Sequence, residues 1–354
     1  MPPTIDSISR RGVMQFAGIA AAGAMLPRAT RAGERAPLAL SEPLGKPTAP
    51  AAAPPAQPPG FYRFKIGGLS AVVLSDGFAK IGPIHPMFAA EANSKDEVDR
   101  TLEMNFHPTD AVNVEFNVLC VKIGPEIILI DSGSGSGAKG TTGKLAGNLA
   151  AAGIRPEQIT AVVVSHAHGD HISGLVDGER LTYPNARIFM NKVEHDFWAG
   201  SPDLATSRLG ADQRKGMIAG AQRTLAQVKP KLELVKGGDK IVGGLELVDT
   251  PGHTPGHLTV IIADGKDQLV AIGDLAHNHV IMFDRPSWTV AFDVDPKMAA
   301  ETRKKMFERF TADRARILAY HLPWPGLGHI SSLGHRPRME SGYAWVIEPW
   351  SWQS

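Results

Sequence analysis

The feature that most constrains the fold and chemistry of this chain is a cluster of four possible metal ligands directly after an apolar run. The run Ala-Val-Val-Val-Ser at residues 161–165 reads as a buried strand, and the letters His-Ala-His-Gly-Asp-His follow it. His166 and His168 are two residues apart, so they project to one side, whereas Asp170 and His171 point elsewhere as the chain turns. Imidazoles and a carboxylate at this spacing suit zinc or a similar divalent ion, and the two directions indicate two ions.

Three further candidate ligands lie downstream. His253 is in the run Thr-Pro-Gly-His-Thr-Pro-Gly-His, where proline and glycine fix a turn. Asp274 and His321 each end an apolar run, and a buried carboxylate such as Asp274 is costly unless it is paired or metal-bound. These positions argue against the alternative, a His-rich surface turn. Ligands at strand ends from distant parts of the chain are how an α/β scaffold assembles a site on one rim.

The chain resembles the metallo-β-lactamase superfamily, whose His-x-His-x-Asp-His signature is matched letter for letter, and the resemblance covers roughly residues 61 to 350. The resemblance implies an α/β fold, a four-layer αβ/βα sandwich with two metal ions at the seam. We expect zinc, with manganese, cobalt or iron as alternatives. By this resemblance, one ion is held by His166, His168 and His253, the other by Asp170, His171 and His321, and Asp274 bridges both.

Departures within the superfamily narrow the expected activity. Flavo-diiron oxygen reductases carry Glu where His168 stands, so oxygen reduction is disfavoured. The true β-lactamases have Cys or Ser near the position of Asp274, so Asp274 argues against antibiotic hydrolysis. Residues 194–198 and 321–330 resemble the methyl parathion hydrolase group, which is mostly secreted or periplasmic, dimeric and binuclear. The resemblance therefore implies a binuclear hydrolase that forms a homodimer.

Two residues near the ligands have predicted roles beside the metals. Asp131 ends an apolar run, and its carboxylate is expected to accept the second N–H of a ligand imidazole; capping a turn is the alternative. His277 lies three residues after Asp274, where similar acyl-homoserine lactonases have a Tyr that contacts the substrate carbonyl. A donor there could stabilise an oxyanion or protonate a leaving alkoxide, whereas a His that merely lines the mouth is the alternative. Because the organophosphate-specialised members have an apolar residue here, His277 favours lactone or ester substrates.

Two tryptophans are predicted to line the substrate pocket. Trp198 matches a pocket Trp of the methyl parathion hydrolase group, and Trp324 replaces a Phe of similar proteins, although a core position for Trp324 is the alternative. Aromatic walls suit a small apolar or aromatic substrate.

The expected reaction is hydrolysis of a lactone or aryl ester by a metal-bridging hydroxide. Asp170 and His277 are the candidates for moving protons to the leaving oxygen. A phosphotriesterase on the same site is the first alternative, and a catalytically silent metal-binding protein on the same fold is the second.

Composition is consistent with an exported enzyme. The 354 residues, 43% of them hydrophobic, can bury a large α/β core. The sequence has no run of 18 or more apolar residues, so we expect no membrane span. Removal of residues 1–32 would change the formal net charge from +1 to about −2, so neither nucleic acid nor an anionic membrane is favoured as a partner. The single cysteine, Cys120, cannot form an intrachain disulfide and is expected to be buried and inert.

The sequence divides into three predicted parts. Residues 1–32 resemble a twin-arginine export signal, with Arg10 and Arg11 before an Ala/Gly-rich apolar segment, although a disordered basic tail is the alternative. Residues 33–60 form a Pro/Ala-rich arm, and residues 61–354 form the hydrolase domain. The expected partner is the twin-arginine machinery and the expected location is periplasmic or extracellular. Within the domain we expect strands at residues 69–75 and 241–248 and helices at 138–152, 211–228 and 296–310.

Replacing Arg10 and Arg11 by Lys is expected to leave the protein in the cytoplasm, because the export machinery reads the arginine pair. Cell fractionation measures the outcome, and the rate of the purified enzyme serves as the control because it should not change. Normal delivery of the double variant to the periplasm would exclude this route.

Overall fold

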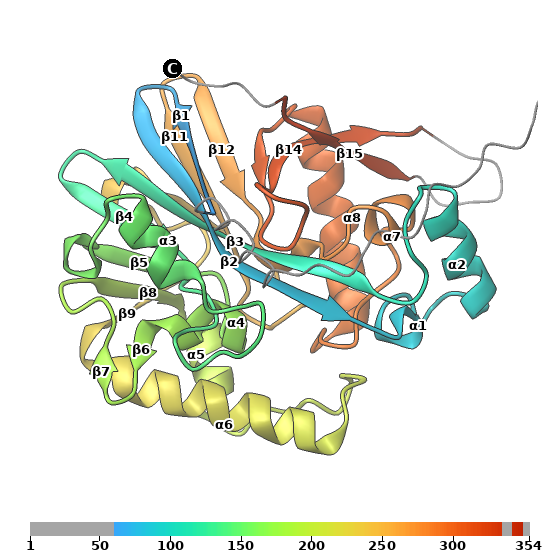
Figure 1. Cartoon of the computed structure of the whole chain (residues 1–354), viewed down its shortest axis with the longest axis horizontal. Coiled ribbons are helices and arrows are strands. Elements are labelled where there is room, and N and C mark those ends of the chain that lie inside the picture. The colour runs from blue at the N-terminus through green and yellow to red at the C-terminus, as the bar shows by residue number, and fades with distance from the viewer. Residues whose placement is uncertain (1–59, 335–341, 350–354) are drawn as a thin grey trace, which may run out of the picture. The chain divides into compact units, whose positions relative to one another are not determined.

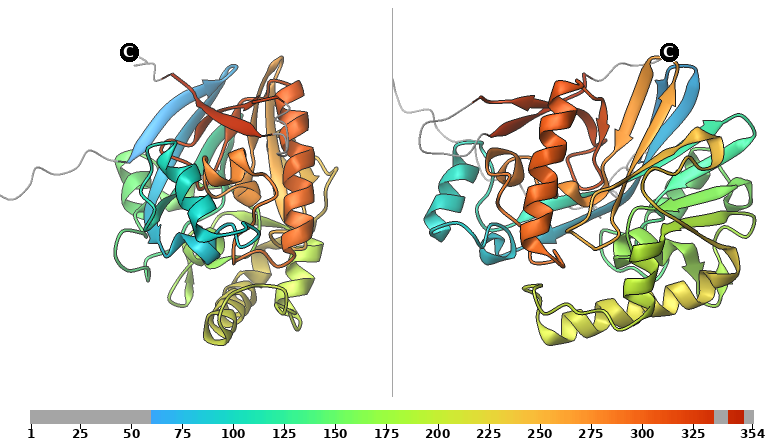
Figure 2. Two further views of the ribbon diagram at one scale, coloured as in Figure 1. Left: turned by 90° about the vertical axis from the view of Figure 1, so that its right-hand side faces the viewer. Right: turned by 180° about the vertical axis from the view of Figure 1, so that it is seen from behind.

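Two mixed β-sheets pack face to face and carry helices on their outer surfaces (Figures 1 and 2). The computed structural model describes residues 60–334 and 342–349, so the predicted export signal and nearly all of the Pro/Ala-rich arm lie outside the described residues. The predicted four-layer α/β sandwich is confirmed. In the part of the chain that is described, no helix is both long and apolar enough to cross a membrane.

The first sheet has seven strands in the order β1-β2-β3-β4-β5-β8-β9, and the second has six strands, β10 to β15, in sequence order. The first sheet comprises β1 (Phe61–Ile66), β2 (Leu69–Ile81), β3 (Val112–Ile123), β4 (Glu126–Ile130), β5 (Ala161–Val164), β8 (Arg187–Asn191) and β9 (Leu232–Val235). The second comprises β10 (Glu246–Asp249), β11 (Leu258–Asp264), β12 (Asp267–Ala271), β13 (Ile317–Leu318), β14 (Leu327–Ser332) and β15 (Tyr343–Ile347), and a small hairpin is formed by β6 (Val176–Asp177) and β7 (Arg180–Leu181).

Helices cover the outer faces of both sheets. The helix α3 lies against β1 and β2, α5 lies against β8 and β9, and α8 lies against β14, as Figures 1 and 2 show. The helices are α1 (Ile84–Met87), α2 (Lys95–Glu103), α3 (Leu145–Ala151), α4 (Gly169–Ile172), α5 (Lys192–Ala199), α6 (Ala211–Val228), α7 (Ile281–Asp284) and α8 (Pro296–Ala312).

The alternation of side chains along each strand builds two apolar layers. In β3, Leu119 and Val121 pack into the core between the sheets, whereas Val118 and Cys120 pack on the helix side. Each fully buried aliphatic side chain of this kind stabilises the fold by about 1.5–3 kcal/mol relative to exposure. Cys120 is buried as expected, and burial raises the pKa of its thiol to about 12, so it is held as an inert thiol.

Strand direction brings chain segments together at one edge. In the first sheet β4, β5, β8 and β9 are parallel neighbours, and in the second β12 and β13 are parallel. The carboxyl ends of parallel neighbours meet at the same edge of a sheet. The residues that follow β4 and β5, and those that follow β12 and β13, are therefore brought close together.

The helix predicted at 296–310 continues two residues further, to Ala312, and three other predicted elements differ more, each next to a glycine with positive φ. The predicted helix at 138–152 begins only at Leu145, because the preceding loop contains several glycines with positive φ. The predicted strand at 241–248 begins at Glu246, since Gly243 and Gly244 turn the chain with positive φ. The predicted strand at 69–75 continues to Ile81, past a register shift at Gly77, whose φ is +102°.

A buried arginine joins α8 to the segment that follows β12. Arg303 donates from Nε to the Leu275 carbonyl at 2.6 Å, and from Nη1 to the carbonyls of Pro286 at 2.8 Å and Trp288 at 2.7 Å. These bonds satisfy carbonyl groups that no helix or strand pairs. They fix the chain on both sides of residues 276–285, which border the candidate site.

Candidate metal centre

The seven predicted metal ligands lie together at the edge where the strands of both sheets end. Possible ligand atoms form groups in each of which all atoms lie within 4.8 Å of one another, and the residues of these groups are mostly buried. The first group contains His166, His168, His253 and Asp274, and the second contains Asp170, His171 and His321. A third group, Asp274, His277 and His321, overlaps both.

Each ligand is positioned by a short segment at the end of a strand. His166 and His168 follow β5, and Asp170 and His171 lie in α4. His253 lies in the loop after β10. Asp274 lies in a single 3₁₀ turn, Gly273–Leu275, after β12, and His321 follows β13, the parallel neighbour of β12. Each sheet therefore supplies part of the site.

In the first group, imidazole nitrogens converge on one point. His168 Nδ1 lies 3.0 Å from His166 Nε2 and 2.9 Å from His253 Nε2. Asp274 Oδ2 lies 3.1 Å from His253 Nε2 and 3.5 Å from His166 Nε2. Three nitrogens and one carboxylate oxygen are a donor set typical of zinc.

The second group shares Asp274 with the first. His171 Nε2 lies 3.2 Å from Asp274 Oδ1, and His321 Nε2 lies 3.1 Å from Asp274 Oδ2. Asp170 Oδ2 is 3.6 Å from His171 Nε2 and 3.5 Å from His321 Nε2. The two oxygens of Asp274 thus face both groups, as expected of a carboxylate that bridges two ions.

The second ring nitrogen of three histidines donates to a fixed acceptor. His171 Nδ1 donates to Asp131 Oδ2, His253 Nδ1 donates to Asp293 Oδ1, and His321 Nδ1 donates to the Glu115 carbonyl, each at 2.8 Å. Since Nδ1 carries the proton, Nε2 presents its lone pair to the site. The structure places Asp131 beside His171 as the sequence analysis expects.

Asp131 has a backbone conformation that serves this contact. Its φ is +67°, in the left-handed region that few residues other than glycine and Asn or Asp adopt. Besides His171, its carboxylate accepts hydrogen bonds from the Ser165 amide at 2.7 Å and the Ser165 hydroxyl at 2.8 Å. The Ser165 hydroxyl lies 3.1 Å from His166 Nδ1, so Asp131 supports one ligand of each group.

The electrostatics of the site favour a cation. Although burial opposes its ionisation, the imidazoles of His171 and His321 hold the pKa of Asp274 well below its usual range. Burial, with repulsion from His171, holds the pKa of His166 well below its usual range, so this imidazole is neutral, as a metal ligand must be. Against the effect of burial, Asp274 and Asp293 raise the pKa of His253 to about 9, so a metal ion there would displace a proton.

Buried atoms without partners are consistent with bound ions. Among the described residues, His171 Nε2 and Asp274 Oδ1 are buried and have no hydrogen-bond partner. Such atoms are costly unless something satisfies them, and both lie on the inner side of the ligand groups. The residues present therefore fit a pair of divalent ions.

A small cavity of about 230 Å³ opens onto the ligands. Its apolar wall comes from Ile81, Val114 and Phe116 on the long antiparallel strands β2 and β3, together with Met217 and Phe292. The polar wall consists of ligand side chains and His277. His277 Nε2 lies 3.1 Å from Asp274 Oδ2, and its Nδ1 is buried without a partner among the described residues.

Neither of the two tryptophans predicted to line the substrate pocket, Trp198 and Trp324, is in the lining of this cavity. Trp198 is completely buried, its ring packs edge-on 5.5 Å from that of His168, and its indole N–H donates to Glu194 at 2.7 Å. Trp324 is half-buried and packs against the core between the sheets, which is the alternative considered for it. Trp198 thus packs against His168, a predicted metal ligand, on the side away from this cavity's lining.

Two contributors were not predicted from the sequence. Asp293 and the Glu115 carbonyl orient ligand imidazoles. Asp293 lies in an acidic stretch that looks like a helix start. A backbone carbonyl leaves no mark in a sequence, so only the fold could reveal the role of Glu115.

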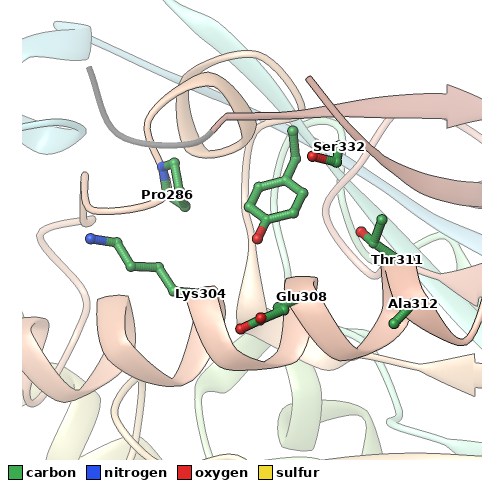
Figure 3. A pocket seen from close by; sticks show the side chains of 7 residues that line it. Pro286, Lys304, Glu308, Thr311, Ala312 and Ser332 are labelled. Carbon is green, nitrogen blue, oxygen red and sulfur yellow. The ribbon is translucent and has the colours of Figure 1, made fainter. Parts of the chain in front are cut away.

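A wider hollow lies far from this chemistry. It has a volume of about 580 Å³ and lies between α8 and the strands β14 and β15, where Lys304, Glu308 and Ser332 line it (Figure 3). Its lining contains one carboxylate and no histidine, so the hollow lacks a metal-ligating set.

Comparison with known proteins decides the family. The family model described as the metallo-beta-lactamase superfamily matches residues 117–321. The chain belongs to this superfamily. Its buried His/Asp groups form a binuclear type of site that superfamily membership leads one to expect.

Solved structures of the superfamily cover nearly the whole described domain. AidC, a dizinc quorum-quenching lactonase seen with a product N-hexanoyl-L-homoserine, is 34% identical, with a TM-score of 0.78 over 82% of this chain and 98% of that one. The hydrolase AbOPH is 31% identical, with a TM-score of 0.75 over 84% and 100%. An N-acyl homoserine lactonase of Bacillus cereus is 26% identical over 34% of this chain and 39% of its own. The chain spans less than two thirds of the length of the first curated relatives that it matches.

Replacing Asp274 by Ala is expected to lower bound metal well below two ions per chain and to abolish turnover, because one carboxylate serves both groups. Elemental analysis of the purified variant measures this. Asp264→Ala is the matched control, since Asp264 lies at the opposite end of the β11–β12 hairpin and only accepts the Gly68 amide. Retention of two ions and normal activity in Asp274→Ala would refute the bridging assignment.

Proposed function

We propose that the protein hydrolyses lactone or aryl ester bonds of small apolar substrates with two divalent ions, zinc in the first instance. The observation that carries the proposal is the position of His277 in the wall of the cavity, beside the shared ligand Asp274. The similarity to AidC, a dizinc lactonase at 34% identity, supports the same reaction class.

The ligand assignment is part of the proposal. His166, His168 and His253 would hold one ion, Asp170, His171 and His321 the other, and Asp274 would serve both. When bound, the ions would supply a nucleophilic water of lowered pKa and polarise the scissile carbonyl.

The remaining work falls to the side chains of the cavity. The apolar wall of Val114, Phe116 and Phe292 would hold the hydrocarbon part of the substrate and exclude water from it. Asp170 is partly exposed at the cavity, and Tyr320 fixes its backbone by donating to its carbonyl at 2.6 Å. Its carboxylate could therefore take up a proton during the reaction. His277 could donate from Nε2 to the developing oxyanion or the leaving oxygen.

The proposed setting of this activity is outside the cytoplasm. The Arg10-Arg11 pair followed by an apolar segment supports export by the twin-arginine route, and the similarity to the methyl parathion hydrolase group supports a homodimer. Both are proposals that the export variant and a measurement of mass in solution would test.

A substrate panel tests the proposed function. The purified chain is expected to hydrolyse a lactone and a generic aryl ester, to lose both activities on chelation and to regain them with zinc, cobalt or manganese. Turnover of a phosphotriester alone would favour the phosphotriesterase alternative. Binding of two ions without turnover of any member of the panel would favour a silent metal-binding protein.

Replacing His277 by Leu is expected to lower kcat on lactones and aryl esters by about 10²-fold or more, with a smaller change in KM, because a proton donor is lost. An activated phosphotriester needs no proton on its leaving group and gains from an apolar wall, so that activity should be equal or higher. His195→Leu, on the half-exposed face of α5, is the matched control. Parallel losses on both substrate classes would mean that His277 supports the metal site generally, and unchanged rates would exclude any role.

A further inference from the structure

Glu194 is a completely buried acidic residue that belongs to neither ligand group. It lies in the first turn of α5, and the fold brings its carboxylate beneath the first ligand group. Its Oε1 accepts from the Ala167 amide at 2.8 Å and from the Trp198 indole N–H at 2.7 Å, and its Oε2 accepts from the Gly256 amide at 2.9 Å. A buried carboxylate with three N–H partners is a built feature, because burying a charge without such partners is costly.

The two amides belong to the two loops that carry the first ligand group. Ala167 lies between His166 and His168, in the loop that follows β5 of the first sheet. Gly256 lies three residues after His253, in the loop between β10 and β11 of the second sheet. One carboxylate thus joins ligand loops that come from different sheets.

Close packing shows that this junction tolerates little displacement. A Cβ on Gly256 would lie 2.2 Å from the Glu194 backbone nitrogen, so only glycine permits the approach. The Trp198 ring, held by its bond to Glu194, packs edge-on against His168. Glu194 and Trp198 therefore contact the backbone beside His166, the ring of His168 and the loop that carries His253.

The second ligand group is held by other contacts. Asp131 and the Glu115 carbonyl orient His171 and His321, and the Tyr320 hydroxyl donates to the Asp170 carbonyl. The contacts of Glu194 described above reach none of these residues. The two groups share Asp274, and Asp131 also reaches His166 through Ser165, but only the first group is contacted by Glu194 and its partners.

We infer that Glu194 is a positioning residue that sets the distance between the two loops of the first ligand group and thereby chiefly the metal affinity of that group. The inference rests on the proposed ligand assignment. The carboxylate suits the role because it only accepts hydrogen bonds, and all three partners donate. Both carboxylate oxygens accept from N–H donors, so a glutamine side chain would place its NH₂ group, which is also a donor, against at least one of them.

Two backgrounds that each keep one ligand group test the inference. Asp170→Ala removes a ligand of the second group, and His253→Ala removes a ligand of the first. Adding Glu194→Gln is expected to weaken Zn²⁺ binding by about 10- to 100-fold in the Asp170→Ala background, the usual effect of losing a residue that supports metal ligands. In the His253→Ala background the affinity should fall much less, because the ligands of the second group have no direct contact with Glu194. Competition with a chromophoric chelator measures both affinities without any assay of turnover.

Glu194→Asp separates the bridge from the charge. The shorter side chain keeps the negative charge but cannot span the same three donors, so the affinity in the Asp170→Ala background should again fall. Wild-type affinity with Asp and low affinity with Gln would show that charge alone matters, and it would overturn the inference. Equal losses in both backgrounds would also overturn it, because they would indicate a general loss of structure.

Asp76→Asn is the matched control for a buried carboxylate. Asp76 accepts from the amides of Ser134 and Leu145, which lie outside the ligand loops, so its replacement should lower the unfolding midpoint and leave metal affinity unchanged. If neither Glu194 variant folds, Trp198→Phe removes one donor only, and a smaller fall in affinity in the Asp170→Ala background is expected; unchanged affinity would overturn the inference. A wild-type chain that binds fewer than two ions would instead refute the proposed ligand assignment.

Discussion

The carboxylate of Asp274 is the point on which the arrangement of this protein depends. Five imidazole nitrogens lie between 3.1 and 3.5 Å from its two oxygens, and all of these groups are buried. A buried carboxylate needs compensating positive charge, and each imidazole beside it needs a hydrogen-bond partner for its second nitrogen. The ends of the strands and the 3₁₀ turn after β12 bring the imidazoles to the carboxylate. Asp131 and Asp293 accept hydrogen bonds from the second nitrogens of His171 and His253.

Much of this arrangement could be predicted because metal ligands are marked by residue type and by their place at the ends of apolar runs. The ligands from His166 to His321 have both marks, and the parallel neighbours β12 and β13 bring the last two together. The fold class followed from the family resemblance that this ligand pattern carries. The helix expected at residues 138–152 was too long, since apolar spacing does not show where positive φ at glycine interrupts it.

The parts that could not be predicted depend on packing between distant segments. Trp198 has the character of a pocket aromatic, yet a buried acceptor, Glu194, fixes its indole N–H and turns the ring behind His168. The cavity wall is formed where the paired strands β2 and β3 extend past a bulge, and a bulge at Gly77 is not apparent from local sequence. A carbonyl acceptor such as that of Glu115 is independent of residue type.

The loops that carry the ligands are far apart along the chain. His168 and His253 are separated by 85 residues, although their ring nitrogens lie 2.9 Å apart. An ion held by both would act as a reversible cross-link in a chain whose single cysteine allows no intrachain disulfide. Cross-links that close long loops restrict the unfolded chain most strongly. The concentration of available metal would then set how readily the two sheets separate. Loss of the ions would make the protein more susceptible to proteolysis as well as inactive.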